Sequence, residues 1–304
     1  MEPTPIDLSI LIVSWNVRDL LAAALAALPA AAPATWEAIV IDNASQDGSA
    51  AMVAERFPDV ALIRNAANAG FGRANNQGIA LARGRYVLFL NSDTVTPPAA
   101  LARLVGFMDA HPEAGACGPR LLLREGRPQA YAFGGDPRPG YLVRRGLNRL
   151  VRGRALHDWA TSETQAVDWV SGACLLVRRE ALPQVGGFDE AFFMYFEDND
   201  LCLRLRQAGW QVFYCPQVSI THLGGQSLKQ NATAQRVYQD SLVYFYRKHY
   251  SRFAQGWLSA GLGLYRLLAS PSGLSPSGRS LRPSGEPLRP PGDRQSGDGH
   301  APSS

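Results

Sequence analysis

The N-terminal part of the chain alternates short apolar runs with helical patterns, and this alternation restricts the folds it can adopt. The run Leu8–Ser14 is apolar and rich in β-branched residues, which is typical of a strand covered on both faces. Further strands are predicted at 36–42, 60–64 and 86–91, with helices at 18–28, 49–57 and up to about 83. This spacing predicts an α/β fold with a Rossmann-like, mostly parallel central sheet flanked by helices.

Polar residues gather where these strands end. Asp42 and Asn43 follow the second predicted strand, and Asn91 and Asp93 follow the fourth. Ligands of doubly wound sheets bind outside the carboxyl ends of the strands. We therefore expect a binding site at this edge.

The second half of the chain is less regular. Strands are expected at 115–123, 167–177 and 211–215, and helices at 98–111, 179–185, 198–208 and 228–249. Proline is expected to end two elements, the first helix before Pro29 and the last strand at Pro216. Residues 124–165 are rich in Gly, Pro and Arg, and we expect an irregular, flexible loop region there.

Three segments are predicted along the chain. Residues 1–250 are expected to form one α/β domain. Residues 251–270 carry Phe253, Trp257 and several leucines beside arginines, and form either an interfacial helix at a membrane or an ordinary packing helix. Residues 271–304 cannot bury enough apolar surface to fold, so a disordered tail is expected.

The composition excludes several classes of protein. With 46% hydrophobic and 18% charged residues the chain is globular, and a net charge of +4 suits an acidic substrate or an anionic membrane face without requiring nucleic acid. No apolar run reaches the roughly 18–20 residues of a membrane span, and no signal peptide is expected. Four cysteines without a CxxC pair favour buried thiols in a reducing cytoplasm.

The segment VIDNASQDGS at 40–49 contains two aspartates at a strand end. A carboxylate there can accept hydrogen bonds from the imide of a pyrimidine base or from a ribose hydroxyl. Asp42 fits either that role or an ordinary turn. Asp47 precedes a predicted helix and is better explained as a turn or cap residue.

The segment NAGFGRANNQGI at 68–79 forms a glycine- and asparagine-rich loop that runs into a helix. Backbone N–H groups in such a loop can approach a phosphate, and Arg73 adds a positive charge. By itself the pattern is equally typical of a chain turn.

The segment LFLNSDT at 88–94 delivers Asn91 and Asp93 at the tip of a buried strand. Mn²⁺ and Mg²⁺ prefer hard oxygen ligands and bind through one or two carboxylates plus phosphate oxygens. Asp93 is therefore the candidate metal ligand.

The segment 185–210 is the most specific of the motifs. Glu197, Asp198 and Asp200 follow an aromatic run and begin a predicted helix, whose dipole accounts for one acid at most. Acids beside aromatic side chains are partly desolvated, which moves a carboxyl pKa towards that of a general base. His222, in ITHLGGQS, is a further candidate metal ligand, although a lone histidine is more often structural.

Together these segments, with IVSWN at 12–16, resemble the family 2 glycosyltransferases, which have the GT-A fold. The resemblance covers residues 8–250, and within the family the chain looks most like bacterial rhamnosyltransferases of O-antigen and cell-wall polysaccharide assembly. It implies an inverting, metal-dependent enzyme. Its partners would be a nucleotide-sugar donor, such as dTDP-rhamnose, and a glycan or polyprenyl-linked acceptor, at the inner face of the plasma membrane.

The resemblance also implies roles for single residues. Val13, Ser14 and Trp15 would line the base pocket, and Asp42 would bind the base or ribose. The remaining donor contacts would be Asn43, Asn68, Gly70, Asn75, Asn91 and Ser92. Asp93 and His222 would hold Mn²⁺ or Mg²⁺, although Asn91 departs from the usual pair of aspartates. Asp198, or alternatively Glu197, would be the base, with Asp200 and Arg204 supporting the helix start.

Two other functions compete with this interpretation. A sugar nucleotidyltransferase would need a glycine-rich, basic loop after the first strand, and Ser14–Leu20 has neither feature. A non-catalytic nucleotide- or glycan-binding module would not need the acids around Asp198. Arginines in 124–165 could contact an anionic lipid carrier, but a solvated loop is the simpler explanation.

Overall fold

The computed structural model describes residues 5–224 and 232–269. Met1–Gly263 forms one compact unit, and the second unit, Leu264–Ser304, is described only over 264–269, at the end of helix α10. The predicted tail at 271–304 and the first residues of the helix predicted at 228–249 lie outside the described residues.

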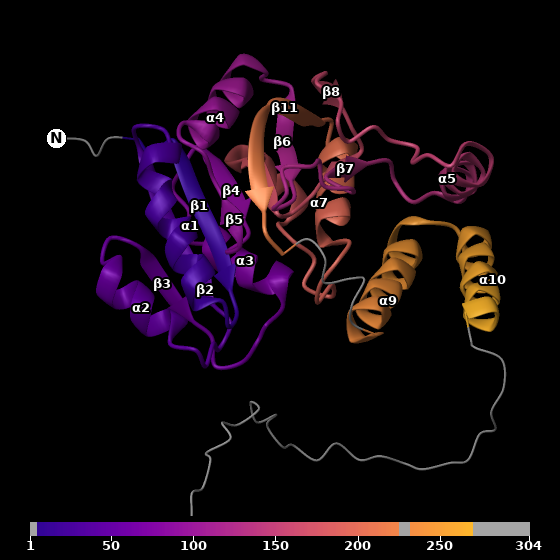
Figure 1. Cartoon of the computed structure of the whole chain (residues 1–304), viewed down its shortest axis with the longest axis horizontal. Helices are drawn as coiled ribbons and strands as arrows, with labels where there is room; N and C mark the ends of the chain where they lie inside the picture. Colours follow the sequence, from indigo (N-terminus) through magenta and orange to yellow (C-terminus); the bar gives the residue numbers. More distant parts are fainter. Residues whose placement is uncertain (1–4, 225–231, 270–304) are drawn as a thin grey trace, which may run out of the picture. The chain divides into compact units, whose positions relative to one another are not determined.

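A nine-stranded sheet forms the centre of the first unit (Figure 1). Its order is β3-β2-β1-β4-β10-β6-β11-β5, and β8 pairs with β11 off this path. The strands are β1 (Leu8–Ser14), β2 (Trp36–Asp42), β3 (Ala61–Arg64), β4 (Tyr86–Leu90), β5 (Thr94–Val95), β6 (Ala114–Leu122), β8 (Gln165–Ala166), β10 (Cys174–Arg178) and β11 (Gln211–His222). A separate pair is formed by β7 (Phe133–Gly134) and β9 (Trp169–Val170).

Most neighbouring strands in the N-terminal half are parallel. β1 pairs in parallel with β2 and β4, β2 with β3, and β6 with β11, whereas β10, β5 and β8 pair antiparallel to their neighbours. The predicted α/β fold with a mostly parallel, helix-flanked sheet is confirmed.

The helices are α1 (Arg18–Ala31), α2 (Ser49–Arg56), α3 (Phe71–Ile79), α4 (Ala100–Ala110), α5 (Pro139–Arg152), the 3₁₀ turn η1 (Arg179–Ala181), α6 (Leu182–Val185), α7 (Glu197–Gln207), α9 (Ala232–His249) and α10 (Arg252–Ala269). Right-handed crossovers place α1 and α2 on one face of the sheet and α3 on the other, because the strand order reverses after β3. None of the helices in the described ranges is long and apolar enough to cross a bilayer.

Two hydrophobic clusters hold the first unit together. In the main core, Leu8, Ile10 and Leu11 of β1 are completely buried, and burying a side chain of this size stabilises a fold by about 1.5–3 kcal/mol. A second core joins α7 to α9 and α10 and contains Phe192, Phe196, Leu203, Leu242, Phe245, Tyr246, Ala254 and Leu258. The four cysteines are free and buried, as expected.

Proline does not end either element where the sequence predicts it. α1 continues through Pro29 to Ala31, whose side chain is buried with that of Leu28. Pro29 costs the helix one backbone hydrogen bond, and packing of this buried face keeps the last turn helical. β11 continues past Pro216 because its register with β6 shifts between Cys215 and Ser219. Pro216 lies within this irregularity, where its missing backbone N–H does not interrupt the pairing.

Two further predictions in the middle of the chain are wrong. Residues 124–165 are not irregular throughout, because they contain α5, β7 and the first residue of β8. The single strand predicted at 167–177 is two strands, β9 and β10, which belong to different sheets. The break between them at Ser171–Ala173 frees the backbone N–H of Gly172 to bond a side chain of α7.

Candidate active site

The carboxyl ends of β1, β2 and β4 meet at one edge of the sheet. Ser14 is directly opposite Asp42 in the parallel register of β1 and β2. Both side chains are buried, Val13 is half-buried, and Trp15 is exposed just beyond the strand. The residues expected to line a base pocket therefore lie together at this edge.

Several buried oxygens near this edge lack partners. In the described part of the chain, Ser14 Oγ, Asp42 Oδ1, Asn75 Oδ1 and Glu197 Oε2 are buried without a hydrogen bond. The other oxygen of Asp42 accepts the N–H of Ser45 at 3.1 Å. Unpaired buried polar groups are rare in folded proteins because each costs free energy. Oxygens of this kind, on β1, β2, α3 and α7, are available to a polar ligand.

The asparagine-rich loop packs against the segment that leads into α7. Asn43 Nδ2 donates to the carbonyl of Gly70 at 3.2 Å, and Asn68 Oδ1 accepts the N–H of Gly70 at 3.0 Å. Gly70 has a φ of +81°, and a Cβ there would lie 2.8 Å from the carbonyl oxygen of Phe193. Glycine is required by both conditions. The loop is thereby fixed beside the start of α7.

Charged residues of these first motifs have clear partners. Arg73 lies on the surface with its Nε 3.6 Å from Glu190, so its charge is paired there. Asp47 accepts the N–H and hydroxyl of Ser49 and the N–H of Arg18, at 2.6–3.0 Å. Its predicted turn role is confirmed.

Asp93 and His222 are brought together by the pairing of β5 with β11. His222 is opposite Thr94 in this antiparallel register, and the N–H of Leu223 donates to the carbonyl of Asp93 at 2.9 Å. His222 Nε2 lies 3.2 Å from Asp93 Oδ1. Burial by itself raises the pKa of Asp93, but the contact with His222 outweighs it and holds the pKa below its ordinary value.

The other ring nitrogen of His222 is held by a residue that the motifs did not identify. Gln129 Oε1 lies 2.9 Å from His222 Nδ1, so Nδ1 is the donor to this amide oxygen and the ring is held in place. Asn91 Nδ2 lies 3.2 Å from His222 Nε2, and Ser92 is buried beside it in the chain. The amide of Asn91 is therefore directed at the histidine.

This arrangement fits a divalent cation whose ligands come partly from the protein and partly from a diphosphate. One carboxylate and one imidazole nitrogen converge, and a hydrogen bond at the other ring nitrogen orients the imidazole, as is usual for metal-binding histidines. Within residues 5–224 and 232–269 no group of three His, Cys, Asp or Glu side chains could hold a metal by itself. Asp93 and His222 would hold the ion, and the substrate would have to complete its coordination.

Gly224 leaves space for the Asp93 carboxylate. A Cβ at this position would lie 1.9 Å from Asp93 Oδ2 and 3.9 Å from His222 Nε2. Any side chain at residue 224 would therefore push the carboxylate away from the histidine.

Asp198 lies at the first turn of α7, next to the break between β9 and β10. Its Oδ2 accepts the N–H of Gly172 at 2.8 Å, and its Oδ1 accepts the N–H of Asn199 at 2.8 Å. The side chain is half-buried, and desolvation raises its pKa although the two N–H groups favour the charged form. A raised pKa in a carboxylate that solvent can still reach is suited to general base catalysis.

Glu197 is in a different environment from its neighbour. It is buried, its Oε2 is without a partner among the described residues, and burial and the charge of Asp198 raise its pKa well above the ordinary value. Both effects favour the neutral acid. Backbone N–H groups orient the carboxylate of Asp198, whereas Glu197 Oε2 has no such donor among the described residues, so Asp198 is the better oriented of the two candidate bases.

Asp200 ties the start of α7 to α9. It is completely buried and lies 2.7 Å from Arg204 Nη2, 2.7 Å from Lys248 Nζ and 2.6 Å from His249 Nε2. Burial raises the pKa of Asp200. The hydrogen bond from His249 and the charges of Arg204 and Lys248 lower it by more, so the pKa is below its ordinary value. Asp200 and Arg204 thus position the helix that carries Asp198.

Replacing Asp200 with asparagine is expected to destabilise the fold. Removing the carboxylate leaves the mostly buried Arg204 without its ion-pair partner, whereas Lys248 keeps its ion pair with Asp189 and some solvent access, so we expect a loss of about 3 kcal/mol at neutral pH. The pKa of Asp200 is lowered in the folded state, so this stabilisation is present above the ordinary carboxyl pKa of 3.8 and is lost as the pH falls through the lower folded value.

Denaturant unfolding of both proteins across the acid range measures this difference. Asp240→Asn is the matched control, because Asp240 is an exposed residue of α9 whose ion pair with Arg236 is 4.0 Å long, and its loss should change stability by less than about 0.5 kcal/mol. Equal stability of the Asp200 and Asp240 variants at neutral pH would contradict the assigned role of the network.

Of the three predicted acids, Asp93 and Asp198 are linked through residues 171–173, and Asp42 lies at the same edge of the sheet. The N–H of Asn91 donates to the carbonyl of Ala173 at 3.0 Å, and the adjacent Gly172 bonds Asp198. The Asp93 segment and Asp198 therefore lie on either side of residues 171–173. Asp42 ends β2, two strands from β4.

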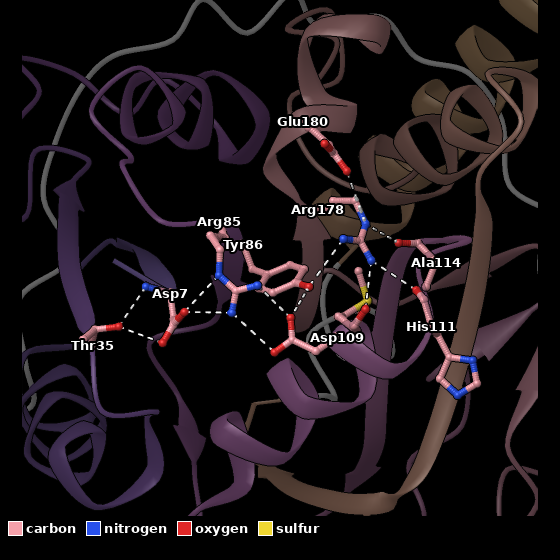
Figure 2. Close-up of polar contacts among 10 residues, drawn as sticks. Asp7, Thr35, Arg85, Tyr86, Asp109, His111, Ala114, Arg178 and Glu180 are labelled. Atoms are coloured by element: carbon pink, nitrogen blue, oxygen red, sulfur yellow. Dashed lines mark hydrogen bonds and ion pairs between the residues drawn. The ribbon is translucent and has the colours of Figure 1, made fainter. Parts of the chain in front are cut away.

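A cavity of about 800 Å³ lies at the edge of the sheet opposite this site, where β4 begins and β10 ends. Figure 2 shows the polar network beside it. Arg85 contacts Asp7 and Asp109 at 2.7–2.8 Å, and Arg178 donates to the carbonyls of Met108, His111 and Ala114. These arginines are used to join β4, α4, β6 and β10, so we assign this edge a structural role.

The fold is that of the GT-A glycosyltransferases. A mannosyltransferase from Pyrobaculum calidifontis, solved with GDP-Man and Mn²⁺, is 18% identical, with a TM-score of 0.50 over 88% of this chain and 85% of its own. GalNAc-T7, solved with UDP, GalNAc and Mn²⁺, is 16% identical, with a TM-score of 0.56 over 81% of this chain and 50% of its own.

Sequence comparison defines the family. The model of Glycosyl transferase family 2 matches residues 9–135, and that of Glycosyl transferase family group 2 matches residues 86–271. The chain belongs to glycosyltransferase family 2. It is 33% identical to the N-acetylglucosaminyl-diphospho-decaprenol L-rhamnosyltransferase of Mycobacterium tuberculosis H37Rv, over 71% of this chain and 75% of that protein. It is 30% identical to the rhamnosyltransferase WbbL of Escherichia coli K12, over 50% of this chain and 60% of that protein.

Proposed function

We propose that this glycosyltransferase moves rhamnose from dTDP-rhamnose to a hydroxyl of a polyprenyl-linked glycan in cell-surface polysaccharide synthesis. The similarity to two rhamnosyltransferases, one of them named for a decaprenol-linked acceptor, supports the donor and acceptor classes. Four buried free cysteines favour a reducing cytoplasm, which supports a reaction at the inner face of the plasma membrane.

The observation that carries the mechanism is the position of Asp198. Its carboxylate is oriented by the N–H of Gly172, is half-buried, and lies across residues 171–173 from Asp93. In the proposed step Asp198 takes the proton of the acceptor hydroxyl while that oxygen bonds to the anomeric carbon. The bond from this carbon to the diphosphate oxygen breaks, and its electron pair leaves with the nucleoside diphosphate.

A single displacement of this kind inverts the anomeric configuration. The unpaired oxygens of Ser14, Asp42 and Asn75 would bind the donor. Asp93 and His222 would hold Mn²⁺ or Mg²⁺, which when bound stabilises the negative charge of the leaving diphosphate.

Transfer assays with purified protein test this function. With a polyprenyl-diphosphate-linked N-acetylglucosamine acceptor we expect dTDP release and a rhamnosylated lipid product from dTDP-rhamnose, and much slower reaction with UDP-galactose or GDP-mannose. Transfer of another sugar would correct the donor alone. Formation of sugar nucleotides without transfer, or nucleotide binding without turnover, would contradict the proposal.

A further inference from the structure

Helix α5 carries a row of exposed aliphatic side chains. Val143, Leu147, Leu150 and Val151 are 45%, 55%, 82% and 78% exposed. Their spacing of i, i+4, i+7 and i+8 places all four on one face of the helix. Large apolar side chains that form a continuous exposed row are uncommon in soluble proteins and mark interaction surfaces. We call this row the α5 stripe.

The rest of α5 is fixed to the protein. Leu142 packs against the second core, next to side chains of α9 and α10. Tyr141 Oη lies 2.8 Å from His157 Nε2, and Asn148 Nδ2 donates to the carbonyls of Arg154 and Ala155 at 3.0 and 3.1 Å. Because these contacts hold the other side of the helix, the α5 stripe remains open to solvent.

The charge around the stripe has one sign. Residues 137–157 contain six arginines and no aspartate or glutamate. Arg144, Arg152 and Arg154 are exposed, and the half-buried Arg145 lies over the ring of Tyr131 at 5.7 Å. An aliphatic row bordered by arginines matches an anionic bilayer, because the side chains enter the headgroup boundary while the guanidinium groups meet lipid phosphates.

We propose that α5 is a membrane-docking helix that lays the α5 stripe on a bilayer surface of anionic phospholipid. The proposal extends the proposed function, in which the acceptor is carried on a lipid, and it would place the site edge near that acceptor. It assigns docking to α5 rather than to α10, where Ala254 and Leu258 are already buried in the second core.

Vesicle sedimentation with the full-length protein tests the docking helix. We expect binding to vesicles that contain phosphatidylglycerol, little binding to pure phosphatidylcholine, and weaker binding at high salt. Replacing Leu147, Leu150 and Val151 together with serine should weaken binding about tenfold or more, since three exposed aliphatic side chains are lost. Replacing Arg144, Arg152 and Arg154 with glutamine should weaken it by about fivefold for each charge removed.

Two single variants serve as matched controls. Leu81→Ser removes an aliphatic side chain of similar exposure outside α5 and should leave vesicle binding unchanged. Phe253→Ser removes an aromatic side chain of α10 that is 84% exposed and should also have little effect. Loss of binding in Phe253→Ser, with binding retained in the α5 triple variant, would overturn the assignment to α5.

Other outcomes would overturn the proposal in different ways. Absence of vesicle binding by the natural protein would do so, as would a dimer in solution that the triple serine variant abolishes. A preference for nucleic acid over anionic vesicles would point to another partner. Transfer to a water-soluble short-chain acceptor reports on the proposed function separately, and the triple serine variant should retain it.

Discussion

Replacing Asp198 with asparagine should reduce sugar transfer by a factor of about 10²–10⁴, which is the usual contribution of a positioned general base. The amide cannot accept the proton of the attacking hydroxyl, so transfer should be lost while dTDP binding is retained. Single-turnover assays with dTDP-rhamnose, together with calorimetric titration of dTDP, separate these effects. A variant that retains near-full transfer would contradict the assignment of Asp198.

Glu197→Gln is the matched control for this experiment. Because burial and the charge of Asp198 raise the pKa of Glu197 well above its usual range, the neutral amide resembles the form already present. We therefore expect only a small loss of transfer. The reverse result, with Glu197→Gln inactive and Asp198→Asn active, would exchange the two roles.

The pH dependence follows from the same environment. The pKa of Asp198 is raised, and a base is active only when it is unprotonated. Transfer by the natural protein should therefore decline as the pH falls through a value above 3.8, the ordinary pKa of an aspartate.

Replacing Asp93 with alanine should reduce transfer by about 10³-fold, corresponding to the several kcal/mol that a bound cation contributes to a developing anion. A chelator should abolish transfer by the natural protein, and Mn²⁺ or Mg²⁺ should restore it. Calorimetric titration of Mn²⁺ in the presence of dTDP measures the ion's affinity directly. Full activity after chelation would contradict the proposed metal site.

Two variants test the surroundings of this site without removing a ligand. Gln129→Ala releases the ring of His222 and should weaken Mn²⁺ binding by about 10–100-fold. Gly224→Ala should also weaken it, because the new Cβ would displace the Asp93 carboxylate. Gly106→Ala is its control, since a Cβ at that position of α4 meets nothing within 4 Å.

The sequence predicts the strands at the site edge well because their apolar runs are continuous. β1 and β2 begin and end at the predicted residues, since most side chains of each run are buried. The contact of Gln129 with His222 could not be predicted, because the two residues are 93 positions apart and neither belongs to a pattern that includes the other. Only the pairing of β5 and β11 places Asp93 beside His222.

The errors in the predicted fold also have physical causes. In α5, arginines and glycines interrupt the aliphatic residues, and four of the five aliphatic side chains face solvent rather than a core, so the helical period is easily missed. The strand predicted at 167–177 reads as continuous because apolar residues flank the break on both sides. What interrupts it is a hydrogen bond from Gly172 to Asp198, a residue on another element.

The ion cluster around Asp200 has a consequence for where this enzyme can be shortened. Lys248 and His249, which contact the carboxylate, are supplied from the last turn of α9, more than forty positions downstream. A truncated protein ending before Lys248 would leave Asp200 with Arg204 as its remaining partner and would cut α9 within its last turn, just after Phe245, which packs on Phe196. The minimal catalytic fragment must therefore extend at least through His249.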